Sequence, residues 1–154
     1  MTTTSSASIA NRELSIERLL NAPRELVWKV WTDPVHCAAW WGPDGFTTTM
    51  QKMELVPGGN WDLIMHGPDG TDYVNHSVFT EVKEPERLVY KHISRPLFEA
   101  FVDFTEEGLQ TRIRMRMLFD TAEERTYAIE TFGADKGLVQ HTGNLIGYLE
   151  KIKS

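Results

Sequence analysis

Residues 110–119, QTRIRMRMLF, alternate between two kinds of side chain. One face of this stretch carries the arginines, and the other carries Thr111, Ile113, Met115, Met117 and Phe119. A period of two predicts a strand with one solvated and one buried face, as is typical of an antiparallel sheet. Glu106-Glu107-Gly108 supplies a hairpin turn before it, so the chain enters this strand from a neighbouring antiparallel one.

The same alternation of apolar and polar residues is found in the segments that precede this strand, over about half of the chain. Two Gly-Pro-Asp-Gly turns, at 42–45 and 67–70, have the chemistry of type I turns and separate strands from one another. Residues 13–21 add a first strand. The faces that we assign together are Trp61, Leu63 and Met65; Val74, His76, Val78, Thr80 and Val82; Leu88, Tyr90 and His92; and Phe98, Ala100, Val102 and Phe104.

Helical spacing appears at both ends of this strand-rich region. Pro23 suits the first position of a helix reaching Thr32, and Asp33-Pro34 predicts a cap and a second short helix to Trp41. Thr121-Ala-Glu-Glu is a capping box that opens a further helix, which Gly133 and Gly137 are expected to interrupt. Beyond them one apolar helical stripe follows, formed by Leu138, Thr142, Leu145, Leu149 and Ile152.

This order predicts an α+β fold in which a single long helix covers a curved sheet. We expect about six to seven antiparallel strands wrapped on the C-terminal helix, with two short helices after the first strand. The length of 154 residues fits one domain, which we assign to residues 12–154. Residues 1–11 are rich in serine and threonine and are expected to form a disordered leader.

Four stretches and one spacing in the sequence form a recognisable set of motifs. They are APRELVWKVWTDPVHCAAWWGPDGFT (22–47), GGNWDLIMHGPDGTDY (58–73), EVKEPERLVY (81–90) and MRMLFDTAEE (115–124), together with the GADKGL spacing of the last helix. This set resembles the motifs of the START-like helix-grip (SRPBCC) superfamily and, within it, those of the homologues of the activator of the heat-shock-protein-90 ATPase. The resemblance implies an apolar cavity between sheet and last helix, suited to lipids, polyketides or other aromatic ligands. Some relatives carry out cyclase or hydrolase chemistry there, but no catalytic motif carries over to this chain.

A curved sheet gripping one helix often leaves space that side chains do not fill, and ligand sites favour such concave apolar spaces. The alternative is a filled core of methionines and aromatic residues. The residues that we expect to line the cavity come from the inner faces assigned above and from the last helix. They are Trp61, Leu63, Met65, His76, Tyr90, His92, Phe98, Val102, Met115, Met117, His141, Thr142 and Leu145.

Three functions compete for this fold. The first is binding of a small hydrophobic or aromatic molecule without catalysis. The second is a cavity enzyme in which His76, His92 or His141 acts as acid or base and Tyr90 donates a proton. The third is a stress-linked interaction protein with a chaperone partner, which is disfavoured because the eukaryotic activator resembles this chain over only one of its two domains.

Other features have a plain structural interpretation beside a functional one. Cys37 is expected to be a packing residue, and the arginines of 112–116 a solvated face paired with acids. The tryptophans between 28 and 41 either anchor the helical pair or wall one mouth of the cavity, and Trp41 is the most exposed candidate. An edge strand or an exposed Trp41 would suit a homodimer.

Composition excludes several classes of partner. Sixteen basic against 22 acidic residues give a net charge of −6, which argues against a nucleic-acid binder and a polybasic membrane protein. The sequence contains no paired cysteines or H-E-x-x-H, so we expect neither metal nor cofactor. With one cysteine and no secretory signal, a cytoplasmic location is expected.

Overall fold

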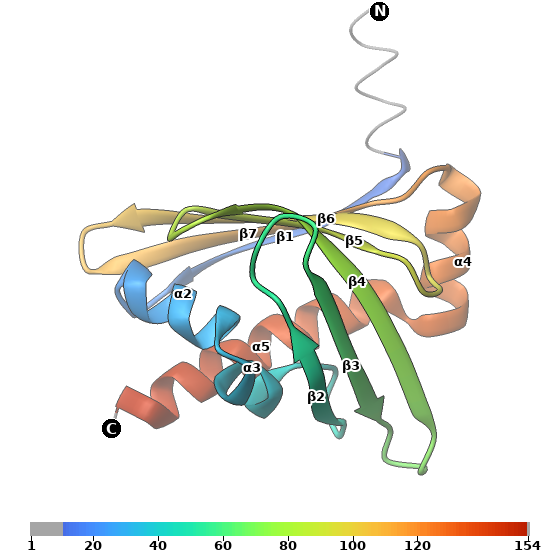
Figure 1. Ribbon diagram of the computed structural model, residues 1–154, viewed down its shortest axis with the longest axis horizontal. Helices are drawn as coiled ribbons and strands as arrows, with labels where there is room; N and C mark the ends of the chain where they lie inside the picture. Colours follow the sequence, from blue (N-terminus) through green and yellow to red (C-terminus); the bar gives the residue numbers. More distant parts are fainter. Residues whose placement is uncertain (1–10, 154) are drawn as a thin grey trace, which may run out of the picture.

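A computed structural model describes residues 11–153, so nearly all of the predicted leader lies outside the described residues. The elements follow one another along the chain as shown in Figure 1. They are β1 (Glu13–Leu20), α2 (Arg24–Thr32), α3 (Pro34–Trp40), β2 (Thr47–Met53), β3 (Asn60–His66), β4 (Asp72–Lys83), β5 (Arg87–His92), β6 (Phe98–Glu107), β7 (Gln110–Leu118), α4 (Ala122–Phe132) and α5 (Ala134–Lys153).

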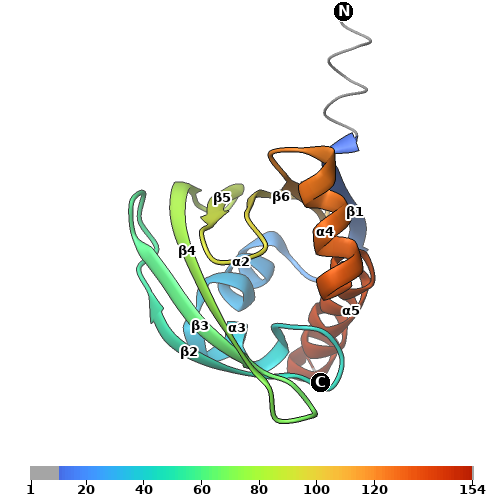
Figure 2. The ribbon, with the colours of Figure 1, turned by 90° about the vertical axis from the view of Figure 1, so that its right-hand side faces the viewer.

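The strands form one seven-stranded sheet in the order β1-β7-β6-β5-β4-β3-β2. Every neighbouring pair is antiparallel, and β1 pairs with β7, so the first and last strands of the chain lie side by side at one edge of the sheet. Figure 2 shows the sheet curling around an interior that α5 closes. The predicted α+β helix-grip architecture is therefore confirmed, with β2 as a strand that the periodicity did not assign.

Helices α3 and α4 begin at the caps that the sequence predicts, whereas Pro23, expected as the first residue of α2, precedes that helix as its N-cap. The Asp33 carboxylate accepts hydrogen bonds from the backbone N–H groups of Val35 and His36, at 2.9 and 3.3 Å, and so caps α3. Thr121 caps α4 by accepting from the N–H of Glu124 at 3.1 Å. Gly133 ends α4 with a positive φ of 64°, as a left-handed C-terminal residue does.

The expected interruption of the helix lies at Gly133, but the expectation that Gly137 takes part in it is wrong. The residue lies within α5, which begins at Ala134, because its N–H bonds the carbonyl of Gly133 at 2.8 Å as part of the first helical turn. The helix has 20 residues, about 30 Å at 1.5 Å per residue. It is long enough to run the length of the sheet, and its buried residues include Leu138, Leu145 and Leu149.

β4 corrects a second expectation. Phe79 pairs with Tyr90 and Glu81 with Val89, so Thr80 is an extra residue that forms a β-bulge. Before the bulge the odd-numbered residues face inward, and after it Val82 does, opposite Leu88. Strict alternation counted back from Val82 therefore placed residues 74–78 on the wrong faces.

The core combines aromatic residues from helices and sheet. Trp31 is completely buried and its ring contacts those of Trp40, Trp41 and Trp61 at centroid distances of 5.1–5.7 Å. On the outer face, Arg112 bonds Glu107 and Arg116 lies 3.8 Å from Glu13. Arg112 and Arg116 are thus paired with acids, as expected for this row. Among the described residues, no helix has the length and apolarity to span a membrane.

Candidate functional site

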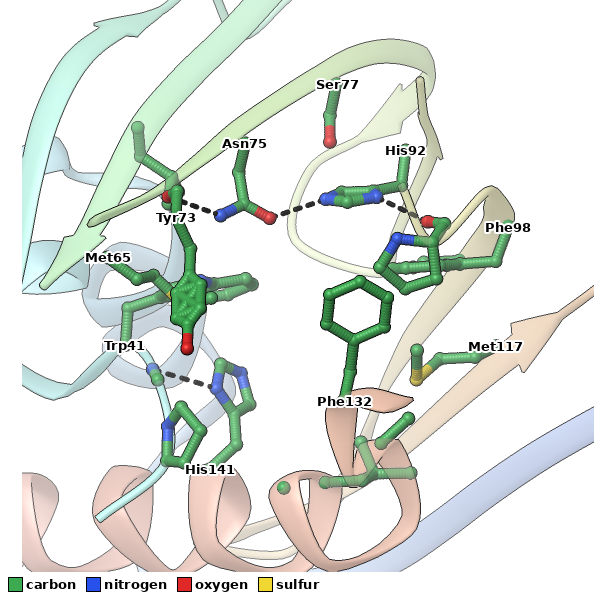
Figure 3. Close-up of a pocket in the computed structure, with 18 of the residues that line it drawn as sticks. Trp41, Met65, Tyr73, Asn75, Ser77, His92, Phe98, Met117, Phe132 and His141 are labelled. Carbon is green, nitrogen blue, oxygen red and sulfur yellow. Dashed lines mark hydrogen bonds between the residues drawn. The ribbon is translucent and has the colours of Figure 1, made fainter. Parts of the chain in front are cut away.

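A cavity of about 290 Å³ lies between the concave face of the sheet and the first turns of α5. The loop after α3, from Trp41 to Phe46, closes one side, and the junction of α4 with α5 closes another. Strands β3 to β7 contribute their inward side chains (Figure 3). The volume is close to the lower end of that of small-molecule sites, which begins near 300 Å³.

The structure brings most of the predicted residues together around this cavity. Those that line it are Trp61, Leu63, Met65, Tyr90, His92, Phe98, Val102, Met115, Met117 and His141. Three do not line it. His76 points away because of the bulge in β4, and its Nδ1 lies 2.8 Å from Asp62 on the outer face. Thr142 and Leu145 are completely buried on the part of α5 that packs into the core.

Residues that the periodicity missed supply much of the wall. On β4 these are Tyr73, Asn75 and Ser77, which share the inward face with Phe79. Phe79 is the bulkiest apolar residue of that strand, so counting from it instead of from Val82 would have found them. The loop residues, among them Pro43, Phe46, Arg95 and Pro96, follow no period and carry no such signal.

Trp41 is a wall of the cavity. It is half-buried, and its ring stands edge-to-face against Trp31, Trp61 and His141 at centroid distances of 5.1, 4.8 and 4.2 Å. Aromatic pairs in this geometry add to the free energy gained from burial alone. The tryptophans therefore serve both interpretations given above, since Trp31 anchors the helical pair and Trp41 lines the cavity.

The imidazole of His141 is held in one tautomer. The backbone N–H of Gly42 donates to its Nδ1 at 3.2 Å, so the proton of the neutral ring sits on Nε2. Nε2 is buried and has no hydrogen-bond partner among the described residues. Burial lowers the pKa of His141 to about 3, because a charged ring would lose its solvation there.

A chain of polar groups forms the other end of the cavity (Figure 3). The amide Nδ2 of Asn75 donates to the carbonyl of Tyr73 at 3.0 Å, and its Oδ1 lies 2.6 Å from Nε2 of His92. The Nδ1 of His92 lies 2.7 Å from the carbonyl of Pro96. Burial lowers the pKa of His92, while its bonds to backbone groups act in the opposite direction.

The hydroxyl of Ser77 completes this polar end. Ser77 pairs with His92 across β4 and β5 and is 4% exposed, and its side chain points into the cavity (Figure 3). Its hydroxyl lines the cavity and takes no part in the hydrogen bonds that join Asn75, His92 and Ser94. A ligand that entered here would find a hydroxyl already desolvated and able to donate.

Nucleophilic and metal chemistry find little support in this arrangement. Cys37 is completely buried, and burial raises the pKa of its thiol well above the ordinary value, which makes it a packing residue. Burial likewise raises the pKa of Tyr90. Over residues 11–153 no group of three histidine, cysteine or acidic side chains is placed to hold a metal ion.

The sequence model of the family described as "Activator of Hsp90 ATPase homolog 1-like protein" matches residues 21–150. The chain belongs to this family. The match begins at the end of β1 and reaches the last turns of α5, so it includes every residue that lines the cavity. No curated protein matches the sequence.

Solved structures of similar proteins share the fold of this chain. A protein from Nitrosomonas europaea is 24% identical, with a TM-score of 0.84 over 94% of this chain and 97% of its own. One from Arthrobacter aurescens is also 24% identical, with a TM-score of 0.85 over 92% and 88%. An AHSA1-like protein from Aeromonas hydrophila is 27% identical, with a TM-score of 0.74 over 92% and 94%.

Proposed function

We propose that this protein binds a small hydrophobic or aromatic molecule in the cavity between sheet and α5, without transforming it. The observation that carries the proposal is the lining of the cavity. Aromatic and methionine side chains form its walls, and a few fixed polar groups stand at its ends. That combination is typical of small-molecule sites, and methionines such as Met65, Met115 and Met117 adapt to the shape of a guest.

The environments of His92 and His141 favour a role in ligand binding over a role as catalytic acid or base. A general acid or base works best when its pKa is near the working pH. The pKa of His141 is about 3, and its Nδ1 is already occupied by Gly42. His92 has both ring nitrogens in hydrogen bonds to the protein. Neither ring therefore presents a lone pair to a substrate in the cavity. The buried free thiol of Cys37 suits a reducing compartment, and we place the protein in the cytoplasm.

The experiment fills the cavity and leaves the surface unchanged. Met117→Trp puts an indole into the space, while the control Leu109→Trp adds the same indole at the exposed tip of the β6–β7 hairpin, where Leu109 is 85% exposed. Binding is measured by the fluorescence of N-phenyl-1-naphthylamine, an uncharged apolar probe, and folding by urea denaturation. We expect Met117→Trp to weaken binding by about tenfold or more and Leu109→Trp to leave it unchanged.

Equal affinity in the two folded variants would show that the probe binds elsewhere. A wild-type protein that raises no fluorescence at all would show that the interior takes no guest. Either result would overturn the proposal.

A further inference from the structure

The net charge of the residues that line the cavity is opposite in sign to the net charge of the whole chain. The chain has 22 acidic and 16 basic residues, yet among the described residues that line the cavity none is aspartate or glutamate. Two arginines do line it. Arg116 lies 3.8 Å from Glu13 and stacks on Phe101, so its charge is directed to the outer face. Arg95 is exposed, and its guanidinium lies over the ring of Tyr127 with no acidic partner within the described residues.

His92 faces two hydrogen-bond acceptors. A carbonyl oxygen such as that of Pro96 only accepts, so Nδ1 carries a proton. The oxygen of Asn75 also accepts, and the Asn75 amide is held in that orientation because its nitrogen donates to Tyr73. Turning the amide over would place two oxygens together at Tyr73 instead. Only a ring with protons on both nitrogens, which carries a positive charge, satisfies every contact.

Burial opposes that charge, and the surroundings supply nothing negative to balance it. The groups that face or adjoin His92 come from β4, from the β5–β6 loop and from β6. They are Asn75, His76, Ser77, Ser94, Arg95, Pro96 and Phe98, and the ring of Phe98 stacks on the imidazole at 4.7 Å. None of them is a carboxylate. The counter-charge that would stabilise a protonated His92 must therefore come from within the cavity.

We propose that the ligand is an apolar or aromatic monocarboxylate whose carboxylate lies at the polar end of the cavity, accepts a hydrogen bond from Ser77 and is the counter-charge of His92. Arg95 at the rim favours the entry of an anion. The apolar body of the ligand extends toward Trp41 and Met65. This inference rests on the proposed function and specifies the class of ligand that the same cavity takes.

The test compares two ligands of one shape. 2-Naphthoate and 2-naphthamide differ in charge and have the same aromatic body, and both are titrated into the full chain by calorimetry at pH 7. We expect the carboxylate to bind at least about tenfold more tightly. Repeating the titration in phosphate and in Tris, whose enthalpies of ionisation differ, should reveal proton uptake with the carboxylate and none with the amide.

Variants of Ser77 locate the carboxylate. Ser77→Ala should cost the carboxylate about fivefold or more in affinity and leave the amide nearly unchanged, and Ser77→Thr, which keeps the hydroxyl, should restore the difference. Equal binding of the two ligands, or a carboxylate that binds without proton uptake, would overturn the anion proposal while leaving cavity binding intact. Failure of both ligands and of the uncharged fluorescent probe would overturn cavity binding as well.

Discussion

The backbone N–H of Gly42 donates a hydrogen bond to Nδ1 of His141, 99 residues further along the chain, at 3.2 Å. This bond ties the loop after α3 to the helix that closes the cavity. It also keeps Nδ1 without a proton, so the folded state holds His141 neutral. Protonation of Nδ1 would abolish this hydrogen bond, and with it the link between the loop and α5.

Acid should therefore destabilise the protein through His141. The ring has a pKa of about 3 when folded and about 6.5 when unfolded, so between these values the unfolded chain binds the extra proton. The contribution of the neutral His141 ring to the free energy of unfolding is complete above pH 6.5 and is lost as the pH falls toward 3. We expect wild type to lose about 3 kcal/mol more between pH 7 and pH 4 than His141→Asn, whose non-titrating Oδ1 takes the place of Nδ1 opposite the N–H of Gly42. Urea denaturation measures both, and parallel curves would contradict the expectation.

Two glycines should respond to alanine in opposite ways. A Cβ at Gly59 would overlap the carbonyl oxygen of Glu54, which is backbone and cannot easily move. Gly143 is exposed within α5, and a Cβ there meets no neighbouring atom. We expect Gly59→Ala to lower the free energy of unfolding by about 3 kcal/mol or more and Gly143→Ala to raise it by about 0.5–1 kcal/mol. Chemical denaturation of the two variants tests both signs.

Cys37 should not react in the folded protein. Its side chain is completely buried and the pKa of its thiol is raised, so the reactive thiolate is rare and shielded. Ellman's reagent should release almost no colour from the native chain and one equivalent after addition of urea. Fast labelling without denaturant would show that α3 opens readily.

Removing the cap of α3 should have a small and specific cost. Asp33 accepts from two backbone N–H groups at the start of α3, and Asp33→Ala leaves both without a partner. The expected loss is about 1 kcal/mol of unfolding free energy, while Asp33→Asn, which keeps an accepting oxygen, should lose less. Thermal unfolding followed by circular dichroism distinguishes the two, and identical losses would mean that the cap contributes through its charge.

The accuracy of the sequence-based expectations follows from the range of the interactions that decide each feature. Strand β7 and the caps at Asp33 and Thr121 depend on neighbours within a few residues, so the pattern alone predicts them. The inward face of β4 depends on where its register with β5 shifts, which is a property of the pairing. Gly137 shows the same limit, since two glycines four residues apart look alike in sequence and only Gly133 has the left-handed backbone of a helix end.

The protonation states of the histidines in the cavity could not be predicted from the sequence for a related reason. His92 and His141 share the same amino acid and both were expected to line the space, yet one faces two acceptors and the other accepts from a backbone N–H. These partners are 4 to 99 residues away. A residue type indicates that a group titrates, and only the fold determines what its protons meet.

The extra residue at Thr80 is a point where β4 can change in length without losing its inward face. Deleting Thr80 would join Phe79 to Glu81 and still leave Asn75, Ser77 and Val82 on one face, because the bulge holds a single surplus residue. What the deletion would remove is the added bend and twist that a bulge gives a strand. A second shift, between Met50 and Lys52 in β2, lies in the same half of the sheet (Figure 1). Deleting the single surplus residue at either of these two points would therefore change how far the sheet curls, and with it the volume of the cavity, without exchanging the side chains that line it.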